Sequence, residues 1–478
     1  MKILLISMPD TTFQLRISLS SIPNLGLASL AGNLKGVECD AKILDLVHKP
    51  YRINKTIKKT IEDFKPDVVG LSAWTYQYDT LLKIARFVKS LKSDIKVVAG
   101  GYHPTLMSEE LGKDEDPYPV DFIVRGEGEL TFKELVRALK EDRKDFSSIK
   151  GISYRKNGCF VHNPKRELAD LNELELPDRS ERILKAKTRF HSVLDLVETS
   201  RGCYLNCKFC SITQMYGKVF RTFPIERVIR DIRNAKQNGA QSVFFVDDNI
   251  TLDVKRFESL CDAIIESGLN DLKYYIQAST KGISSSEKLS RKMRKAGFRA
   301  VYMGIECGSD ETLEFLDKGS TTNHTMKAIE NLRGNDIRVF GGFIVGNPDD
   351  TKKDVKNVFK FAKKINVDYL GLGILTPLPK TVIRDELLQQ GLILNKDDYS
   401  KYNGFECNIK TKYLSDKQLK RLVSRGYLGY TWHMLFHSGN LWSKPYYSMK
   451  NLALLGGIIY LMFSYMNGNW RRSDFHRF

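Results

Sequence analysis

The sequence predicts an α/β protein made of two successive α/β domains and an α-rich C-terminal extension. Strand-like apolar runs alternate with amphipathic helical patterns over residues 1–145 and again over residues 191–395. Such alternation is typical of parallel sheets covered by helices. The alternation is lost over residues 396–478, where the sequence becomes aromatic. A length of 478 residues also exceeds what one hydrophobic core usually organises, which favours two domains.

The first domain is predicted to hold a doubly wound, Rossmann-like parallel sheet. Its strand-like runs are Lys2–Ser7, Ala41–Leu46, Val68–Ala73, Lys96–Gly100 and Phe122–Arg125, and the helical patterns between them are Leu25–Leu34, Ile57–Phe64, Tyr78–Leu91 and Leu130–Leu139. In such sheets ligands bind beyond the carboxyl ends of the strands. Small or glycine-bearing turns stand at three of these ends, at residues 72–75, 100–104 and 125–129. Turns of this kind allow a bulky ligand to approach the backbone closely.

A small hairpin and a linker are expected between the two domains, over residues 146–190. Asn157-Gly158 is a strong hairpin signal, and a short apolar run flanks it on each side. Polar sequence and Leu176-Pro177 follow the hairpin.

The second domain, residues 191–395, is predicted to be a partial (β/α)6 barrel. Its strand-like runs are Val193–Thr199, Ser242–Val246, Lys273–Ala278, Ala300–Ile305, Arg338–Ile344 and Tyr369–Leu375. A complete barrel of this class has eight strands, so six imply a partial or open one.

Three closely spaced cysteines follow the first strand of this second domain. Cys203, Cys207 and Cys210 are spaced C-x3-C-x2-C in a glycine-bearing loop. Three thiolates can hold three irons of a cubane cluster and leave the fourth iron open. A structural zinc site needs a fourth Cys or His, and the nearest, His191, lies at the far end of the preceding strand. The spacing therefore favours an iron–sulfur cluster.

This motif, with Phe209 before its last cysteine, resembles the signature of the radical S-adenosylmethionine (SAM) superfamily. The resemblance implies a [4Fe–4S] cluster whose open iron binds SAM, and cleavage of SAM to a 5′-deoxyadenosyl radical. It also implies an electron donor such as flavodoxin or ferredoxin. The protein's own task in such chemistry is to position and shield the cofactor.

The same resemblance implies SAM contacts at the ends of three barrel strands. Asp247 stands where the family commonly has a Gly-Gly-Glu motif that contacts the SAM amino group. Its neighbour Asp248 is an alternative for this contact, and the Asp pair could instead cap the next helix. Glu306 matches the residue that contacts the ribose, and the alternative for it is a plain ion pair. The segment with Gly342, Val345 and Gly346 matches the stretch whose backbone lies behind the adenine.

The first domain resembles the cobalamin (B12)-binding domain that precedes radical SAM barrels in one subgroup. The likeness rests on the order of its turns, and the implied cobalamin contacts are Ser72, Gly100, Gly101, His103, Gly126 and Glu127. The Asp-x-His-x-x-Gly motif that supplies a lower cobalt ligand is absent, so cobalamin is expected to bind base-off, with His103 beside its nucleotide tail. The alternative is a flavodoxin-like domain without cobalamin.

The net charge of +18 fits a lysine-rich solvated surface or contact with anionic lipid headgroups. Arginines are not interleaved with aromatics, so nucleic acid is not an expected partner. No secretory signal is visible, which predicts a cytoplasmic protein. Residues 451–466 carry no charge, and basic and aromatic residues flank them. They predict a helix lying on the cytoplasmic face of a membrane or a helix buried against the barrel, whereas a full span is disfavoured by their length.

Together these features predict a cobalamin-dependent radical SAM enzyme. We expect C-methylation of an unactivated carbon on a hydrophobic small molecule such as a lipid or a tetrapyrrole. One alternative is oxidative cyclisation, as in the magnesium-protoporphyrin monomethyl ester cyclases of the subgroup. The other is a non-catalytic cobalamin or iron–sulfur sensor.

Overall fold

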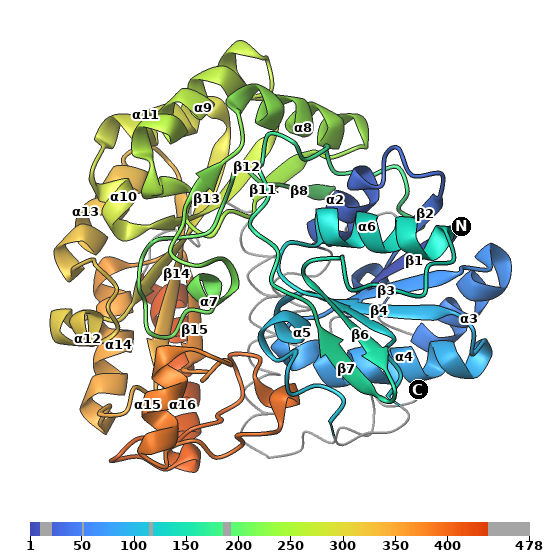
Figure 1. The fold of residues 1–478 in the computed structure, drawn as a ribbon. Helices are drawn as coiled ribbons and strands as arrows, with labels where there is room; N and C mark the ends of the chain where they lie inside the picture. The colour runs from blue at the N-terminus through green and yellow to red at the C-terminus, as the bar shows by residue number, and fades with distance from the viewer. Residues whose placement is uncertain (10–21, 50–51, 114–117, 185–192, 438–478) are drawn as a thin grey trace.

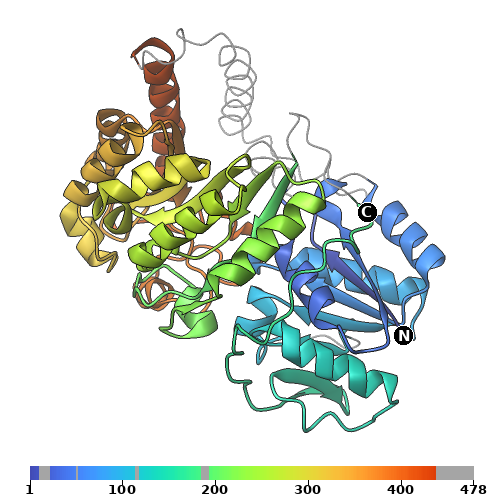
Figure 2. The same ribbon diagram turned by 90° about the horizontal axis from the view of Figure 1, so that it is seen from above.

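The computed structural model describes residues 1–9, 22–49, 52–113, 118–184 and 193–437. Two sheets lie side by side, each covered by helices, and the C-terminal elements pack beside the second sheet (Figure 1, Figure 2). The predicted α/β class and the order of its two sheets are confirmed.

The first sheet has the strand order β2-β1-β3-β4-β5-β6-β7. Its strands are β1 (Lys2–Ser7), β2 (Asp40–Asp45), β3 (Val68–Ser72), β4 (Lys96–Gly100), β5 (Phe122–Val124), β6 (Ile152–Lys156) and β7 (Cys159–His162). Strands β1 to β5 are parallel, and their order reverses at β1 and β3. In doubly wound sheets such a reversal marks the ligand-binding edge.

Helices cover both faces of this sheet because its strands are apolar on both sides. Helices α3 (Ile53–Phe64) and α4 (Tyr78–Leu91) cover one face, and α2 (Leu25–Asn33) and α6 (Gly128–Lys140) cover the other. Along β1, Leu4 and Ile6 point into the core beneath α3 and α4, whereas Ile3 and Leu5 point into the core beneath α2 and α6. The short helix α5 (Tyr102–Leu106) follows β4.

The hairpin of β6 and β7 is present, but it does not stand apart between the domains as we expected. β6 pairs antiparallel with β5, with Phe122 opposite Tyr154, so the hairpin extends the first sheet. Ile152 and Tyr154 are buried in the core beneath α6. The physical reason is that the hairpin covers the free edge that β5 would otherwise present.

The second sheet contains six parallel strands in the order β15-β14-β13-β12-β11-β8. They are β8 (Leu194–Val197), β11 (Ser242–Phe245), β12 (Lys273–Ser279), β13 (Phe298–Glu306), β14 (Arg338–Val345) and β15 (Tyr369–Ile374). Its helices are α8 (Ile225–Gln237), α9 (Val254–Glu266), α10 (Thr280–Ser284), α11 (Glu287–Ala296), α12 (Asp310–Phe315), α13 (Thr322–Arg333), α14 (Lys352–Ile365) and α15 (Val382–Gln389). Strands β9 (Ser200–Arg201) and β10 (Arg221–Thr222) form a separate antiparallel pair, and α7 (Ile212–Tyr216) lies between them in the chain.

The C-terminal part touches both domains. Helix α16 (Asp416–His437) packs on the second domain, where the Tyr430 hydroxyl donates to the Val367 carbonyl at 2.7 Å. The turn η4 (Tyr399–Lys401) reaches the first domain and contacts α4. In the described part of the chain, no helix is long and apolar enough to cross a membrane. Residues 451–466 lie outside the described residues.

Candidate active site

The cysteine loop begins at a tightly braced turn after β8. Gly202 has φ +83°, and a Cβ there would lie 2.4 Å from the Val219 carbonyl oxygen, so only glycine fits. The Gly202 N–H donates to the Asp248 carboxylate at 3.0 Å. Farther along the loop, the Lys208 N–H donates to the Leu316 carbonyl and the Lys208 carbonyl accepts from Ile383 N–H, both at 3.1 Å. The loop is therefore held at its start by β11 and at its end by α12 and α15.

The three cysteine thiols lie close enough to influence one another. Burial, and then the neighbouring thiols, raise the pKa of Cys203 to about 11 and that of Cys210 to about 12. Among the described residues, no three Cys, His, Asp or Glu side chains converge as they would around one metal ion. Three thiolates from one loop suit three irons of a cubane, whereas a structural zinc site needs a fourth Cys or His ligand.

The two aspartates after β11 have different surroundings. Asp247 is 1% exposed and accepts hydrogen bonds from Thr199 N–H, from the Thr199 hydroxyl at 2.6 Å and from the Ser200 hydroxyl. Its carboxylate thus braces the chain before the cysteines. Asp248 is the one whose charge acts on Cys203 and Cys210, and burial raises its pKa to about 6. Neither aspartate caps the next helical turn, because Asn249 does so.

Glu306 forms a buried ion pair, which was the alternative to its predicted contact with the SAM ribose. Its backbone has φ +63°, at a register shift between β13 and β14. Lys318 Nζ lies 2.5 Å from Glu306 Oε1, and the two side chains are 13% and 8% exposed. Burial lowers the Lys318 pKa, but Glu306 and Cys207 outweigh it and raise this pKa well above its usual range. Lys318 Nζ also lies 5.7 Å from the centre of the Phe209 ring, so the ammonium sits beside the cysteine loop.

Gly342, Val345 and Gly346 do not form one uniform wall. A Cβ on Gly342 would lie 2.5 Å from the Tyr302 hydroxyl oxygen, so the Tyr302 side chain lies over this glycine. Val345 is fully buried in the core. Gly346 has φ +92°, and its Cβ would meet Ile409 and Leu419 of the C-terminal part at 3.0 Å. Of the three, only Gly342 lies on the face of the sheet that carries Tyr302.

That face of the second sheet carries a row of aromatic side chains that sequence analysis missed. Tyr302 is paired in register with Phe340, and Phe340 with Tyr369. The Phe340 and Tyr369 rings are stacked at 4.1 Å. Tyr302 and Phe340 are 42% and 38% exposed, whereas their neighbours Met303 and Val339 point into the core. Their alternation along each strand was visible in the sequence, but which face was covered by helices was not.

The ligand-binding edge of the first sheet is built from small residues, as predicted. Gly101 has φ +93°, and its Cβ would lie 2.8 Å from the Ala73 carbonyl oxygen, which brings the turns after β3 and β4 together beside Ser72. Around Gly126 no atom lies within 4 Å of a Cβ position, and around Gly100 the nearest is 3.6 Å away. Such an edge has the open backbone that a bulky cofactor needs.

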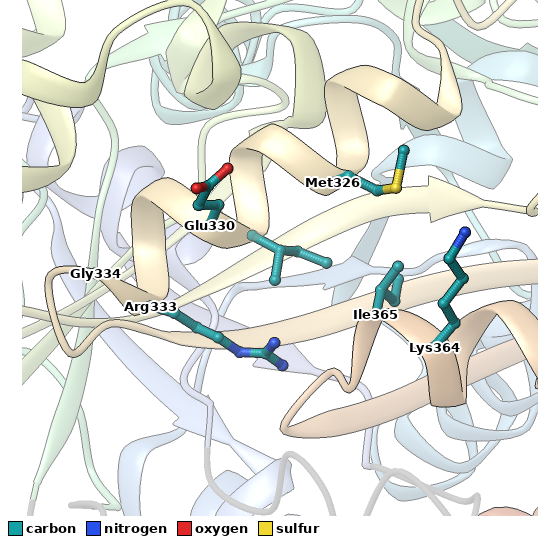
Figure 3. Close-up of a pocket in the computed structure, with 7 residues that line it drawn as sticks. Met326, Glu330, Arg333, Gly334, Lys364 and Ile365 are labelled. Atoms are coloured by element: carbon teal, nitrogen blue, oxygen red, sulfur yellow. The ribbon is translucent and has the colours of Figure 1, made fainter.

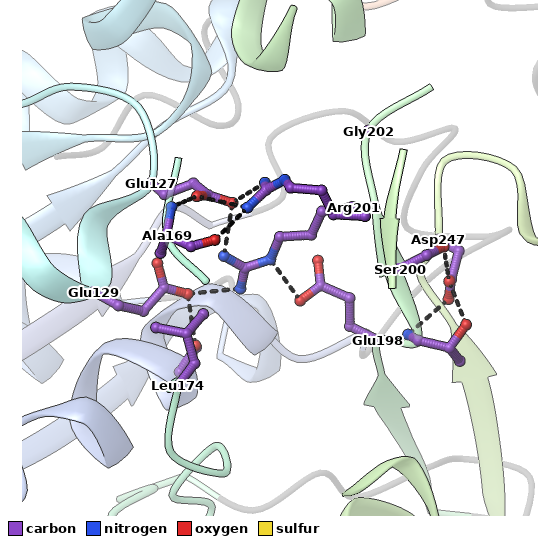
Figure 4. A network of polar contacts seen from close by, with 12 residues as sticks. Glu127, Glu129, Ala169, Leu174, Glu198, Ser200, Arg201, Gly202 and Asp247 are labelled. Atoms are coloured by element: carbon purple, nitrogen blue, oxygen red, sulfur yellow. Dashed lines mark hydrogen bonds and ion pairs between the residues drawn. The ribbon is translucent and has the colours of Figure 1, made fainter. Parts of the chain in front are cut away.

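Two expected cobalamin contacts do not face this edge. His103 is 1% exposed, its ring lies between those of Tyr78 and Tyr399, and burial lowers its pKa to about 3. Glu127 is engaged by Arg201 and Arg221 of the second domain (Figure 4). The reason in both cases is domain packing, because other parts of the chain cover these side chains.

The two candidate cofactor edges meet at the domain interface. Helix α5, which follows the Gly100-Gly101 turn, contacts α7, which follows the cysteine loop. Burial, then the charges of Tyr216 and Asp248, raise the Tyr102 pKa well above its usual range. A groove between α13 and α14, lined by Met326, Arg333 and Lys364, lies on the outer side of the second domain and contains none of the predicted site residues (Figure 3).

Comparisons with known proteins agree with this geometry. The chain matches the radical SAM superfamily over residues 197–362 and the B12 binding domain over residues 18–136. It is 35% identical over 433 residues to an uncharacterized methyltransferase of Pyrococcus horikoshii, which covers 90% of this chain and 92% of the relative. It is 30% identical over 394 residues to the anaerobic magnesium-protoporphyrin IX monomethyl ester cyclase of Rubrivivax gelatinosus, with 80% of this chain and 68% of the relative covered.

A solved structure has the same overall fold. It is that of the radical S-adenosylmethionine methyltransferase TsrM from Kitasatospora setae, with cobalamin and a [4Fe–4S] cluster bound. The TM-score is 0.72 at 17% identity, over 89% of this chain and 88% of that chain. The cysteine loop and the small-residue edge of the first sheet fit the cofactors that these families use. The chain therefore belongs to the radical SAM superfamily, as an enzyme with an N-terminal B12-binding domain whose cofactors are a [4Fe–4S] cluster, SAM and cobalamin.

Proposed function

We propose that this enzyme transfers a methyl group to an unactivated carbon of a hydrophobic small molecule. The observation that carries the proposal is the contact between α5 and α7, which places the small-residue edge of the first sheet against the cysteine loop of the second domain. A carbon atom held between these two edges can meet both cofactors. The relative named as a methyltransferase, similar over nearly its whole length, supports the same reaction class.

The roles of the side chains follow from their positions. When bound, the cluster and SAM supply a radical that removes a hydrogen atom from the substrate, and cobalamin supplies the methyl group. Cys203, Cys207 and Cys210 hold the cluster. Asp248 makes the contact with the SAM amino group, because the Asp247 carboxylate already accepts hydrogen bonds from Thr199 and Ser200.

Glu306 orients the SAM ribose, and Lys318 holds Glu306 in place. The backbone around Gly342 lies behind the adenine. Ser72, Gly100, Gly101 and Gly126 leave the space for cobalamin at the edge of the first sheet. The close packing of the two domains keeps water from the reacting groups, which protects a radical from side reactions.

The aromatic row supports a hydrophobic substrate. Tyr302, Phe340 and Tyr369 present ring faces and edges on the side of the sheet that carries Gly342. Solvent-accessible aromatic rings favour flat or extended apolar molecules, such as tetrapyrroles or isoprenoid lipids.

Oxidative cyclisation is a second candidate. The similarity to the anaerobic magnesium-protoporphyrin IX monomethyl ester cyclase of Rubrivivax gelatinosus favours it. A cyclase would use the same cysteines and SAM contacts but would transfer no methyl group.

Labelled SAM distinguishes the two reactions. The protein is reconstituted anaerobically with iron, sulfide and hydroxocobalamin, and is supplied with a reductant, methyl-deuterated SAM and an organic extract of cells that lack the protein. Methyl transfer predicts 5′-deoxyadenosine together with a product that carries deuterium, and a variant with all three loop cysteines changed to Ala forms neither. Formation of 5′-deoxyadenosine with a new product but no deuterium would instead establish cyclisation.

A further inference from the structure

A network of buried charges connects the two cofactor-binding edges (Figure 4). Its centre is Arg201 on β9, two positions before Cys203, with a side chain that is 8% exposed. Each nitrogen of its guanidinium group faces a different carboxylate. Arg201 donates to Glu129 at 2.6 Å, to Glu127 at 3.1 Å and to Glu198 at 3.0 Å. Two of these three acids belong to the first domain.

Arg221 adds a second link from the neighbouring strand. It lies opposite Arg201 in the β9–β10 pair and donates to Glu127 at 2.5 Å and to the Ala169 carbonyl at 2.7 Å. The Glu127 carboxylate also accepts the Ala169 N–H at 3.0 Å. Glu129 accepts a further hydrogen bond from the Ser29 hydroxyl at 2.8 Å. Glu127 is thus engaged through both of its carboxylate oxygens, and Glu129 is engaged through Oε1.

The place of this network in the chain indicates what it does. Glu127 directly follows Gly126, which lies on the small-residue edge of the first sheet, and Glu129 is in the first turn of α6. Arg201 directly precedes Gly202, whose N–H is bound by Asp248. One group of ion pairs therefore joins the turn at Gly126, on the small-residue edge, to strand β9, which directly precedes the cysteine loop. Bidentate and forked guanidinium–carboxylate contacts fix orientation as well as distance.

We propose that Glu127, Glu129 and Arg201 are positioning residues. They set the distance and orientation between the small-residue edge of the first sheet, where cobalamin would bind, and the cysteine loop. The inference deepens the proposed function, because a methyl transfer needs one substrate carbon to be in reach of both cofactors. It also applies if the reaction is a cyclisation, since the contacts of the network are all between protein groups. Loosening it should leave each cofactor bound but misplace one relative to the other.

The test uses Glu129→Gln, with Glu127→Gln as a second variant. Both replacements keep the shape of the side chain and remove its charge. The matched control is Arg179→Lys, because Arg179 is equally buried and paired with Asp195 and Asp231, but links no cofactor edge. Iron and cobalamin content confirm that each variant is loaded. In the loaded proteins, the reduced cluster is paramagnetic and should speed the electron-spin relaxation of cob(II)alamin. The size of this enhancement depends on the distance between the cluster and the cobalt.

We expect one well-defined relaxation enhancement in the wild type and in Arg179→Lys, and a weaker, broadened one in Glu129→Gln. Hydrogen exchange of the cofactor-free protein should rise at residues 126–129 in Glu129→Gln and stay at the wild-type level in Arg179→Lys. Turnover should become uncoupled, with several times more 5′-deoxyadenosine formed per product than in the wild type.

Wild-type relaxation and wild-type coupling in a fully loaded Glu129→Gln would overturn the proposal. If Glu129→Gln fails to hold both cofactors, Glu127→Gln decides by the same measurements. A wild type that forms no methylated product would remove the methyl-transfer proposal alone, because the relaxation and exchange measurements do not depend on the reaction.

Discussion

Replacing Lys318 by methionine tests whether the Glu306 ion pair is the support of the SAM site. Lys318 Nζ and Glu306 Oε1 are 2.5 Å apart, and both side chains are nearly inaccessible to solvent. Methionine fills a similar volume but leaves the Glu306 carboxylate buried without its partner. Breaking a buried pair in this way costs about 3–5 kcal/mol of the free energy of unfolding. The strained backbone at Glu306, with φ +63°, gives the carboxylate little freedom to escape to solvent.

A matched control comes from Lys208 in the cysteine loop. Lys208 pairs with Glu386 at 2.9 Å, but these side chains are 27% and 30% exposed. Partly exposed pairs contribute about 0–1 kcal/mol to stability, so Lys208→Met should change the free energy of unfolding by no more than about 1 kcal/mol. The double variant Lys318→Met with Glu306→Gln removes both charges and should recover most of the lost stability, because the desolvated charge is gone.

Urea unfolding of the cofactor-free proteins measures the stabilities, and equilibrium dialysis of the reconstituted proteins measures SAM affinity. Lys318→Met should be the least stable variant and should bind SAM at least about tenfold more weakly, a difference of about 1.4 kcal/mol. The double variant should be stable yet still bind SAM weakly. The reasoning is refuted if Lys318→Met unfolds within about 1 kcal/mol of Lys208→Met, the range expected for an exposed pair.

Two further predictions concern acidic residues near the loop. Asp248→Asn should weaken SAM binding with little change in the free energy of unfolding. Asp247→Asn should keep its SAM affinity but lower the free energy of unfolding by about 1–3 kcal/mol, because hydrogen bonds are lost. Dialysis and urea unfolding measure these two quantities, and the opposite pattern would restore Asp247 as the SAM contact. Burial raises the pKa of Glu198 from 4.5 to about 7. The folded state therefore binds more protons than the unfolded state between these values, and stability should fall as pH rises through this window. Glu198→Gln should flatten that fall in thermal midpoints measured from pH 5 to pH 8, and an unchanged slope would show that other groups cause it.

Local patterns were sufficient to predict the strands and to single out the cysteine loop. The strand Lys2–Ser7 was placed correctly because both of its faces are apolar, which is typical of a strand buried between two layers of helices. The C-x3-C-x2-C motif could be recognised because all three cysteines lie in one short segment. Contacts that form only when the two domains pack together could not be predicted from the sequence. Glu127 and Arg201 are 74 positions apart, and nothing local indicates that this carboxylate meets a guanidinium rather than a ligand.

The same limit explains the two aspartates and the lysine. Asp247 and Asp248 are neighbours after a strand, and which of them faces the cysteine loop depends on the path of the chain around Gly202. Lys318 lies after α12, and its partner Glu306 is 12 positions earlier, across a turn that the spacing does not define. Sequence therefore identifies the residue types that the chemistry needs, while the packing decides which of them are free to act.

The bracing of the cysteine loop is uneven, and this bears on how a cluster could be assembled. Before Cys203 every residue is fixed: Thr199 and Ser200 by Asp247, Arg201 by three carboxylates and Gly202 by Asp248. Cys207 and Cys210, in contrast, are only half-buried. Cys203 would thus be a preoriented ligand of a cluster, with Cys207 and Cys210 more accessible to incoming iron. Of these residues before Cys203, Arg201 alone is bound by carboxylates of the first domain, so it links the bracing of the cysteine loop to the contact between the two domains.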